Sequence, residues 1–148
     1  MILVHGTTVA LEGDGVLLRG PSGSGKSDLA LRLIDAGARL VADDQTELIR
    51  SPSGLIARSP ASIAGKMEVR GVGILHVPTV SSAPVRLAVD LVPPDRVERL
   101  PEPQFCEYLQ YSLPLVGLAP FEASTPAKIR LALASLVQTA TLPIVGAP

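Results

Sequence analysis

Eight residues near the start of the chain combine glycines, a lysine and a serine in a spacing that suits phosphate binding. The stretch reads GPSGSGKS. Glycines at this spacing let backbone N–H groups turn inward around phosphate oxygens. Lys26 can neutralise the β- and γ-phosphates, and the Ser27 hydroxyl can ligate Mg²⁺. The stretch therefore predicts a nucleotide site with ATP and Mg²⁺ as cofactors, formed by Gly20, Pro21, Ser22, Gly23, Ser24, Gly25, Lys26 and Ser27.

The flanking sequence predicts the two elements that such a loop needs. Residues 15–20, GVLLRG, are typical of a short buried strand that runs into the loop. After the loop, apolar residues recur at helical spacing as Leu29, Ala30, Leu33 and Ile34, and Gly37 is suited to end that helix. The alternative is a glycine turn with an incidental lysine. A strand before the loop and a helix after it favour the phosphate site.

Two carboxylates follow at the end of the next apolar run, residues 38–44, ARLVADD. Strand, loop, helix and strand form a βαβ unit with an expected right-handed crossover. A parallel arrangement places Asp43 and Asp44 at the carboxyl edge of the sheet, beside the phosphates. One carboxylate can organise Mg²⁺ and the other can accept a proton from a hydroxyl. The alternatives are solvated turn aspartates, or Asp90 at the metal, although its mid-strand position favours a structural role.

A third polar segment, KMEVRGVGILHV at residues 66–77, holds Glu68 and Arg70 before a glycine-rich turn. Side chains two residues apart on an extended segment face the same way. Both groups can therefore reach a metal–phosphate cluster, and a surface ion pair at a strand start is an equally good interpretation.

The remaining pattern predicts an α/β fold: one domain over residues 1–148, with a mixed sheet that contains the phosphate-binding loop and flanking helices. Further strands are expected at residues 2–11, 71–77 and 85–92, with a hairpin over residues 47–59. A surface connection is expected at 93–103, an amphipathic helix at 127–140, and a frayed tail at 141–148.

Composition narrows the class of protein. The net charge of −1 gives no sign of a nucleic-acid surface. No stretch reaches the about 18 apolar residues of a membrane helix, so no membrane association is expected. A single cysteine, Cys106, allows no disulfide within the chain and indicates a reducing compartment. The expected location is the cytoplasm.

Four stretches in this order resemble the catalytic domain of HPr kinase/phosphorylase: HG at His5, GPSGSGKSDLAL, RLVADD and MEVRGVGIL. The resemblance covers roughly residues 1–135, and the length of 148 residues is similar to the compact alphaproteobacterial form of the family. It implies a kinase that transfers phosphate from ATP to a serine of HPr, the carrier protein of the bacterial phosphotransferase system. It also implies a reverse reaction, in which inorganic phosphate attacks phosphoserine, and assembly as a hexamer.

The resemblance also implies roles for single residues. Lys26 and its loop would bind ATP, and Ser27 and Glu68 would ligate Mg²⁺. Asp44 would accept the serine proton, which leaves Asp43 for the metal. His5 matches an active-site histidine of the family, and Arg99 matches an arginine near the transferring phosphate, whereas His76 matches no role.

One departure from the family pattern concerns the reverse reaction. Longer members carry paired arginines before the last helix, whereas this chain has no arginine between Pro114 and Pro126. Whether this chain catalyses phosphorolysis is therefore left open. Two other interpretations also stay open: a phosphate-loop kinase with a different acceptor, and an ATP-binding sensor that transfers no phosphate.

Overall fold

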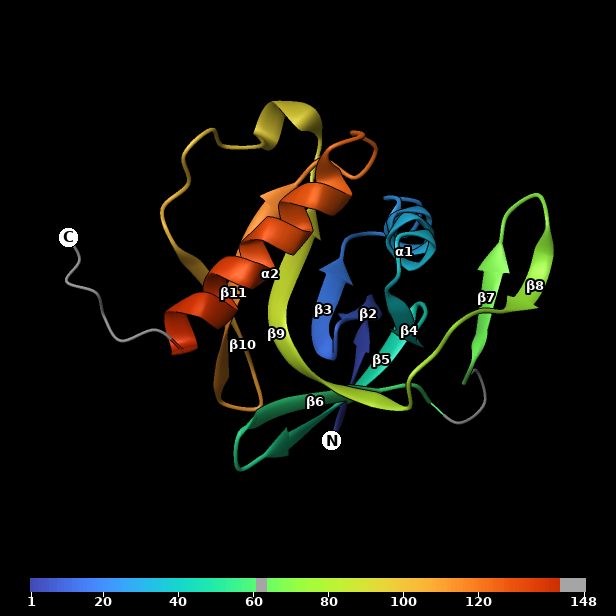
Figure 1. Cartoon of the computed structure of the whole chain (residues 1–148), viewed down its shortest axis with the longest axis horizontal. Helices are drawn as coiled ribbons and strands as arrows, with labels where there is room; N and C mark the ends of the chain where they lie inside the picture. The colour runs from blue at the N-terminus through green and yellow to red at the C-terminus, as the bar shows by residue number, and fades with distance from the viewer. Residues whose placement is uncertain (61–63, 142–148) are drawn as a thin grey trace.

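The computed structural model describes residues 1–60 and 64–141. The order of its elements is β1 (Ile2–His5), β2 (Thr7–Leu11), β3 (Asp14–Arg19), α1 (Lys26–Asp35), β4 (Arg39–Ala42), β5 (Gln45–Ser51), β6 (Gly54–Arg58), β7 (Lys66–Val69), β8 (Gly73–His76), β9 (Ser82–Leu91), the short 3₁₀ turn η2 (Pro94–Arg96), β10 (Gln104–Tyr108), β11 (Tyr111–Leu118) and α2 (Thr125–Thr141). The expected mixed α/β fold with flanking helices is confirmed (Figure 1).

The centre of the sheet has the strand order β4-β2-β3-β9-β11. Strand β3 is parallel to β9, and β9 is parallel to β11. Strand β2 is antiparallel to both β3 and β4, so β4 runs in the same direction as β3. The carboxyl ends of β4, β3, β9 and β11 therefore lie along one edge, where loops can converge on a ligand.

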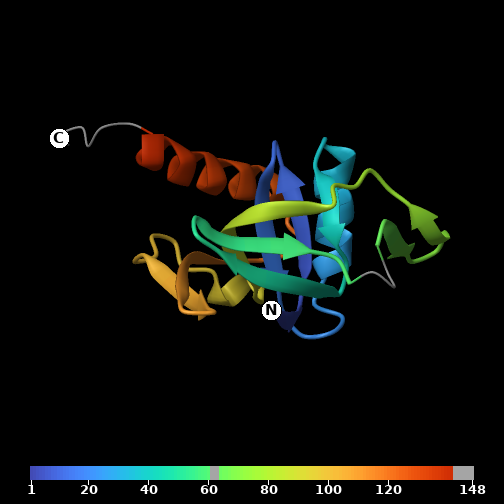
Figure 2. The same ribbon diagram turned by 90° about the horizontal axis from the view of Figure 1, so that it is seen from below.

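Strand β9 joins this central part to a second group of strands. Its first residues pair antiparallel with β6, and its later residues pair with β3 and β11. Strand β6 continues to β5 and β1, so the sheet curls over on itself. Figure 2 shows α2 on one side of the curled sheet and the β5–β6 hairpin on the other.

Both faces of the central strands are buried, because successive side chains point to opposite sides. On β3, Val16 and Leu18 pack with α1 and α2, whereas Leu17 packs with the β5–β6 hairpin and with Leu113 of β11. This double burial holds the edge that carries the polar residues in a fixed position.

Two of the expected elements differ from the structure. The single strand expected at residues 2–11 is divided at Gly6 into β1 and β2, which pair with different partners. A Cβ at Gly6 would lie 2.9 Å from the backbone oxygen of Leu18, so only glycine lets the chain cross there. The predicted βαβ unit is also present, but β2 lies between its two parallel strands.

The hairpin of β5 and β6, the strands β8 and β9 and the C-terminal helix confirm their predictions. The hairpin of β10 and β11 was not predicted. The predicted frayed tail lies outside the described residues except for Thr141, the last residue of α2. Across the described ranges, no helix is both long enough and apolar enough to span a membrane.

Candidate active site

The phosphate-binding loop connects β3 to α1 as the sequence predicts. Gly23 and Gly25 adopt positive φ angles of 80° and 102°, a conformation that glycine adopts without strain. Lys26 begins α1 and is only 6% exposed. Its Nζ donates hydrogen bonds to the carbonyl oxygens of Gly20 and Pro21, at 2.7 and 2.9 Å. The ammonium group therefore lies across the loop at the positive end of the helix, where an anion binds favourably.

Close packing explains why the loop needs glycine at its ends. A Cβ at Gly20 would lie 2.5 Å from Ser24 Oγ, and a Cβ at Gly25 would lie 2.8 Å from the ring of Phe121. Ser24 Oγ is itself buried and has no hydrogen-bond partner within the described part of the protein. Buried hydroxyl groups are nearly always paired, so this orphaned group fits a loop that takes a ligand.

Asp43 lies directly beside the end of the loop. Its Oδ1 accepts a hydrogen bond from Ser27 Oγ at 2.8 Å and another from Thr7 Oγ1 at 3.1 Å. The predicted convergence of the phosphate-binding loop with the acidic end of β4 is therefore present.

Thr7 organises the two aspartates together and was not singled out from the sequence. It is fully buried, and besides donating to Asp43 it accepts a hydrogen bond from the backbone N–H of Asp44 at 3.1 Å. Asp44 has a φ of 68°, in the left-handed region that a non-glycine residue adopts only where its surroundings hold it. The available signal was a pair of threonines, Thr7 and Thr8, before an apolar run.

Asp44 and His5 extend toward solvent on the same side. His5 Nδ1 lies 3.6 Å from Asp44 Oδ1, with side chains that are 49% and 67% exposed. The two residues are also joined through the backbone, because the N–H of Gly6 donates to the carbonyl oxygen of Asp44 at 2.9 Å. The structure thus places the matched histidine beside the proposed proton acceptor.

A cavity of about 710 Å³ opens in front of the loop. One side consists of loop residues and the start of α1, and the opposite side consists of the β7–β8 hairpin. Glu68 and Arg70 both line it, as does Asp44. Within the described residues, neither Glu68 nor Arg70 forms an ion pair, which disfavours the interpretation of these two as a surface pair. The full lining is Ser22, Gly23, Gly25, Lys26, Ser27, Asp28, Leu31, Asp44, Met67, Glu68, Val69, Arg70, Gly71, Gly73, Ile74 and Phe121.

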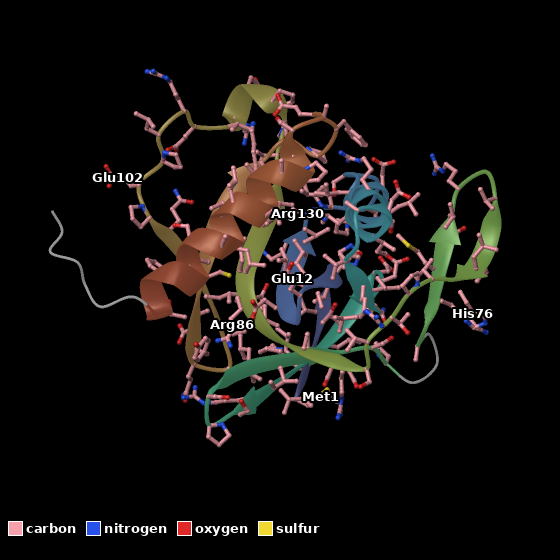
Figure 3. All side chains as sticks on the ribbon, viewed as in Figure 1. Met1, Glu12, His76, Arg86, Glu102 and Arg130 are labelled. Atoms are coloured by element: carbon pink, nitrogen blue, oxygen red, sulfur yellow. The ribbon has the colours of Figure 1, made fainter. Side chains whose placement is uncertain are left out.

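Neither of the matched residues His5 and Arg99 lines this cavity, but His5 lies beside Asp44, which does line it, whereas Arg99 lies elsewhere on the surface. Arg99 is exposed, in the connection between η2 and β10. Figure 1 shows that connection on the opposite side of the molecule from the β7–β8 hairpin, and Figure 3 labels Glu102 on it. Figure 3 also shows His76 at the end of β8, extending into solvent.

Asp90 has a structural partner, although it lies next to the last residue of β9 and not in mid-strand as predicted. Arg19 binds it through two hydrogen bonds, of 2.6 and 3.0 Å, and donates a third to the Tyr108 hydroxyl at 3.0 Å. The hydrogen bonds that Arg19 donates to Asp90 raise the pKa of Arg19 above its ordinary value. This pair joins the last residue of β3, directly before the loop, to β9 and β10. Burial raises the pKa of the Cys106 thiol nearby, which makes it a poor nucleophile.

The acidic residues do not form a closed metal cage. No group of three or more His, Cys, Asp or Glu side chains able to hold a metal occurs among residues 1–60 and 64–141. An arrangement of one hydroxyl and one carboxylate, Ser27 and Asp43, suits Mg²⁺, which is usually held by one or two carboxylates together with substrate phosphates and water.

Comparison with known proteins adds to this geometry. Residues 1–96 match the model of the HPr serine kinase C-terminal domain. HPr kinase/phosphorylase of Clostridium acetobutylicum is 47% identical over 77 residues, which cover 52% of this chain and 25% of that protein. The enzyme of the same name from Halalkalibacterium halodurans is 48% identical over 81 residues, or 54% of this chain and 26% of that protein. The chain thus matches about a quarter of the length of these curated relatives.

A solved structure extends the similarity to nearly the whole fold. The Hpr(Ser) kinase/phosphatase from Coxiella burnetii superposes with a TM-score of 0.83 and 26% identity, over 95% of this chain and 99% of that one. The family model covers well over half of the chain and includes the phosphate-binding loop, both aspartates and Glu68. The chain therefore belongs to the HPr serine kinase C-terminal domain family.

Proposed function

We propose that this chain is an ATP-dependent protein serine kinase that phosphorylates an HPr-like carrier protein. The observation that carries the proposal is the hydrogen-bonded path from the loop to the acidic strand end, in which Ser27 donates to Asp43. This path would hold the phosphate site next to the end of β4, where the proposed proton acceptor Asp44 follows Asp43. Proteins that share the fold and the family are named as HPr kinases, which supports HPr as the acceptor.

The loop would hold the triphosphate of ATP. Its backbone N–H groups and Lys26 would contact the phosphates, once Nζ exchanges the carbonyl oxygens of Gly20 and Pro21 for phosphate oxygens. Ser27 and Asp43 would hold Mg²⁺, with Glu68 approaching from the hairpin side of the cavity. Bound Mg²⁺ supplies positive charge that neutralises the phosphate oxygens.

Asp44 would act as the general base. As the serine oxygen forms its bond to the γ-phosphorus, the serine proton passes to the Asp44 carboxylate and the bond from the γ-phosphorus to the bridging oxygen breaks, leaving ADP. His5, 3.6 Å away, would orient that carboxylate. Arg99 is proposed at the transferring phosphate on the family match alone, and its exposed position gives it less support than the others have.

The kinase direction has more support than phosphorolysis. The stretch from Pro114 to Pro126 contains no arginine, and its residues beside the cavity include Phe121 instead. We therefore expect attack of inorganic phosphate on phosphoserine to be slow relative to phosphorylation. The proposed setting is the cytoplasm, with the chain assembled as a hexamer as in the family it belongs to.

Incubation with HPr, ATP and Mg²⁺, followed by mass measurement of HPr, tests the proposal. The expected result is the addition of one phosphoryl group to a serine, with none in the absence of Mg²⁺. Phosphorylation of another acceptor would point to a phosphate-loop kinase of different specificity. Binding of ATP with no transfer to any acceptor would indicate a nucleotide sensor and would contradict the proposal.

A further inference from the structure

The loops on either side of the phosphate-binding loop differ in chemistry. In the strand order β4-β2-β3-β9-β11, β4 and β11 lie at equal distance from β3 on opposite sides, and both run parallel to it. The chain after β4 carries Asp43 and Asp44, whereas the chain after β11 carries Phe121. A nucleotide held by the loop would therefore lie between an acidic side and an aromatic side. The acidic side suits the metal and the reacting hydroxyl.

Phe121 lies against the phosphate-binding loop itself. Its ring approaches Gly25 so closely that a Cβ there would lie 2.8 Å from Cζ. The side chain lines the cavity and yet is 68% exposed, which is unusual for a large aromatic group without a partner. Ile74, on the hairpin, and Leu31, on α1, add apolar surface to the same cavity.

The segment that carries Phe121 is fixed rather than free. Arg32 of α1 donates hydrogen bonds to the carbonyl oxygens of Pro120 and Glu122, and Thr125 Oγ1 donates to the carbonyl oxygen of Ala119. The backbone on both sides of Phe121 is therefore held by hydrogen bonds from α1 and α2, so a ligand that stacks on the ring would lose little entropy in ordering this segment.

The charges beside the ring are already paired. Asp28 forms an ion pair with Arg32 at 2.9 Å, and Glu122 forms one with Lys128 at 3.3 Å. The surface around Phe121 therefore suits a flat, neutral group better than a charged peptide. The cavity volume of about 710 Å³ is also in the range of sites that enclose a small molecule.

We propose that Phe121 stacks on the purine base of the nucleotide whose phosphates the loop holds. This inference rests on the proposed function, because it requires that the loop bind a nucleoside triphosphate. The base lies on the β11 side of the loop, and the γ-phosphate lies on the β4 side, near Asp44. The aromatic side chain then sets affinity for the nucleoside part of the ligand and has no part in binding the phosphates.

The test compares ATP with inorganic tripolyphosphate, which keeps the phosphates and lacks the base. Dissociation constants are measured by calorimetry with Mg²⁺ for the wild type, Phe121→Ala and Phe121→Trp. Removing a stacking ring weakens binding of a base by about 5- to 150-fold. We expect a loss in that range for ATP with Phe121→Ala, an unchanged constant for tripolyphosphate, and recovery with Phe121→Trp.

The chain supplies a matched control. Phe105 is the other phenylalanine, is 61% exposed on β10, and does not line the cavity, so Phe105→Ala should leave both constants unchanged. Equal loss of ATP and tripolyphosphate binding in Phe121→Ala would overturn the proposal, since it would indicate a distorted loop. Unchanged ATP binding with a raised KM for HPr would overturn it in favour of protein docking. A wild type that binds neither ligand would instead refute the proposed function.

Discussion

The phosphate-binding loop and the β7–β8 hairpin face the same cavity, but the chain holds them in place differently. The loop continues directly from β3, a strand with neighbours on both sides in the buried centre of the sheet. Its lysine is buried and hydrogen-bonded to the loop backbone. The hairpin pairs only with itself, in a separate two-stranded sheet. Figure 1 shows it projecting beyond α1.

Met67 is the most deeply buried side chain that attaches the hairpin, and Val69 and Val77 pack partly buried against the same core. Met67 is 1% exposed and packs into the core with α1, whereas Val72 and Ile74 are exposed. Segments with few buried contacts open at lower free energy than the core does. The difference indicates that the phosphate site has a fixed shape. The hairpin opposite it, which carries Glu68, adjusts when substrates bind.

Among the variants that compare the loop with the hairpin, the largest effect is expected at the loop. Lys26→Ala removes the buried ammonium that would balance charge on the transferring phosphoryl group, and losing such a group lowers kcat by about 10²–10³-fold or more. Steady-state transfer to HPr measures the loss, and circular dichroism checks that the fold survives. Transfer at the wild-type rate would remove the loop from the mechanism.

On the hairpin side, Glu68→Gln should act through the metal. The substitution keeps the size of the side chain and removes its charge, so we expect apparent Mg²⁺ affinity to fall by about 10- to 100-fold. A Mg²⁺ titration of the transfer rate should show recovery at high metal concentration. Arg70→Gln, beside it in the same cavity, is the control for a general change in hairpin charge. An unchanged Mg²⁺ profile in Glu68→Gln would assign the metal to the loop side alone.

Thr7→Val tests how the two aspartates are held. Valine has the shape of threonine but lacks the hydroxyl that donates to Asp43 and accepts from Asp44. An unpaired buried group costs about 1–3 kcal/mol, so kcat should fall roughly tenfold with little change in the affinity for ATP. Thr7→Ser should restore the rate. Equal losses in both variants would show that the hydroxyl has no part in positioning.

The smallest effect on activity is expected where only attachment of the hairpin changes. Met67→Ala should lower the free energy of unfolding by about 2–5 kcal/mol, because it opens a cavity in the core. Val72→Ala, at the exposed tip of the same hairpin, should change it by no more than about 0.5 kcal/mol. Urea unfolding gives both values. Similar values for the two variants would contradict the distinction between anchor and tip.

The features predicted from sequence are those set by local chemistry. The phosphate-binding loop follows from glycine and lysine spacing, and the acidic end of β4 follows from an apolar run that stops at two carboxylates. Asp90 was expected to be structural and is paired with Arg19, although it lies at the carboxyl end of β9 and not in mid-strand. In each case a few neighbouring residues determine the local conformation.

The features that sequence missed depend on contacts between distant residues. Thr7 reaches Asp43 across 36 positions of the chain, which no local pattern records. The β10–β11 hairpin contains Pro114, a residue that argues against a central strand. Proline is accommodated there because pairing of β11 with β9 begins only at Leu115, so Pro114 has a neighbouring strand on one side only, β10.

The central claim is that Asp44 accepts the proton of a serine hydroxyl while the loop holds the triphosphate. The most direct measurement is the rate of phosphoryl transfer to HPr by Asp44→Asn at saturating ATP and Mg²⁺, with ATP affinity measured in parallel. Loss of a general base lowers the rate by about 10²–10⁴-fold, and we expect ATP binding to remain at the wild-type level. A transfer rate equal to that of the wild type would contradict the account.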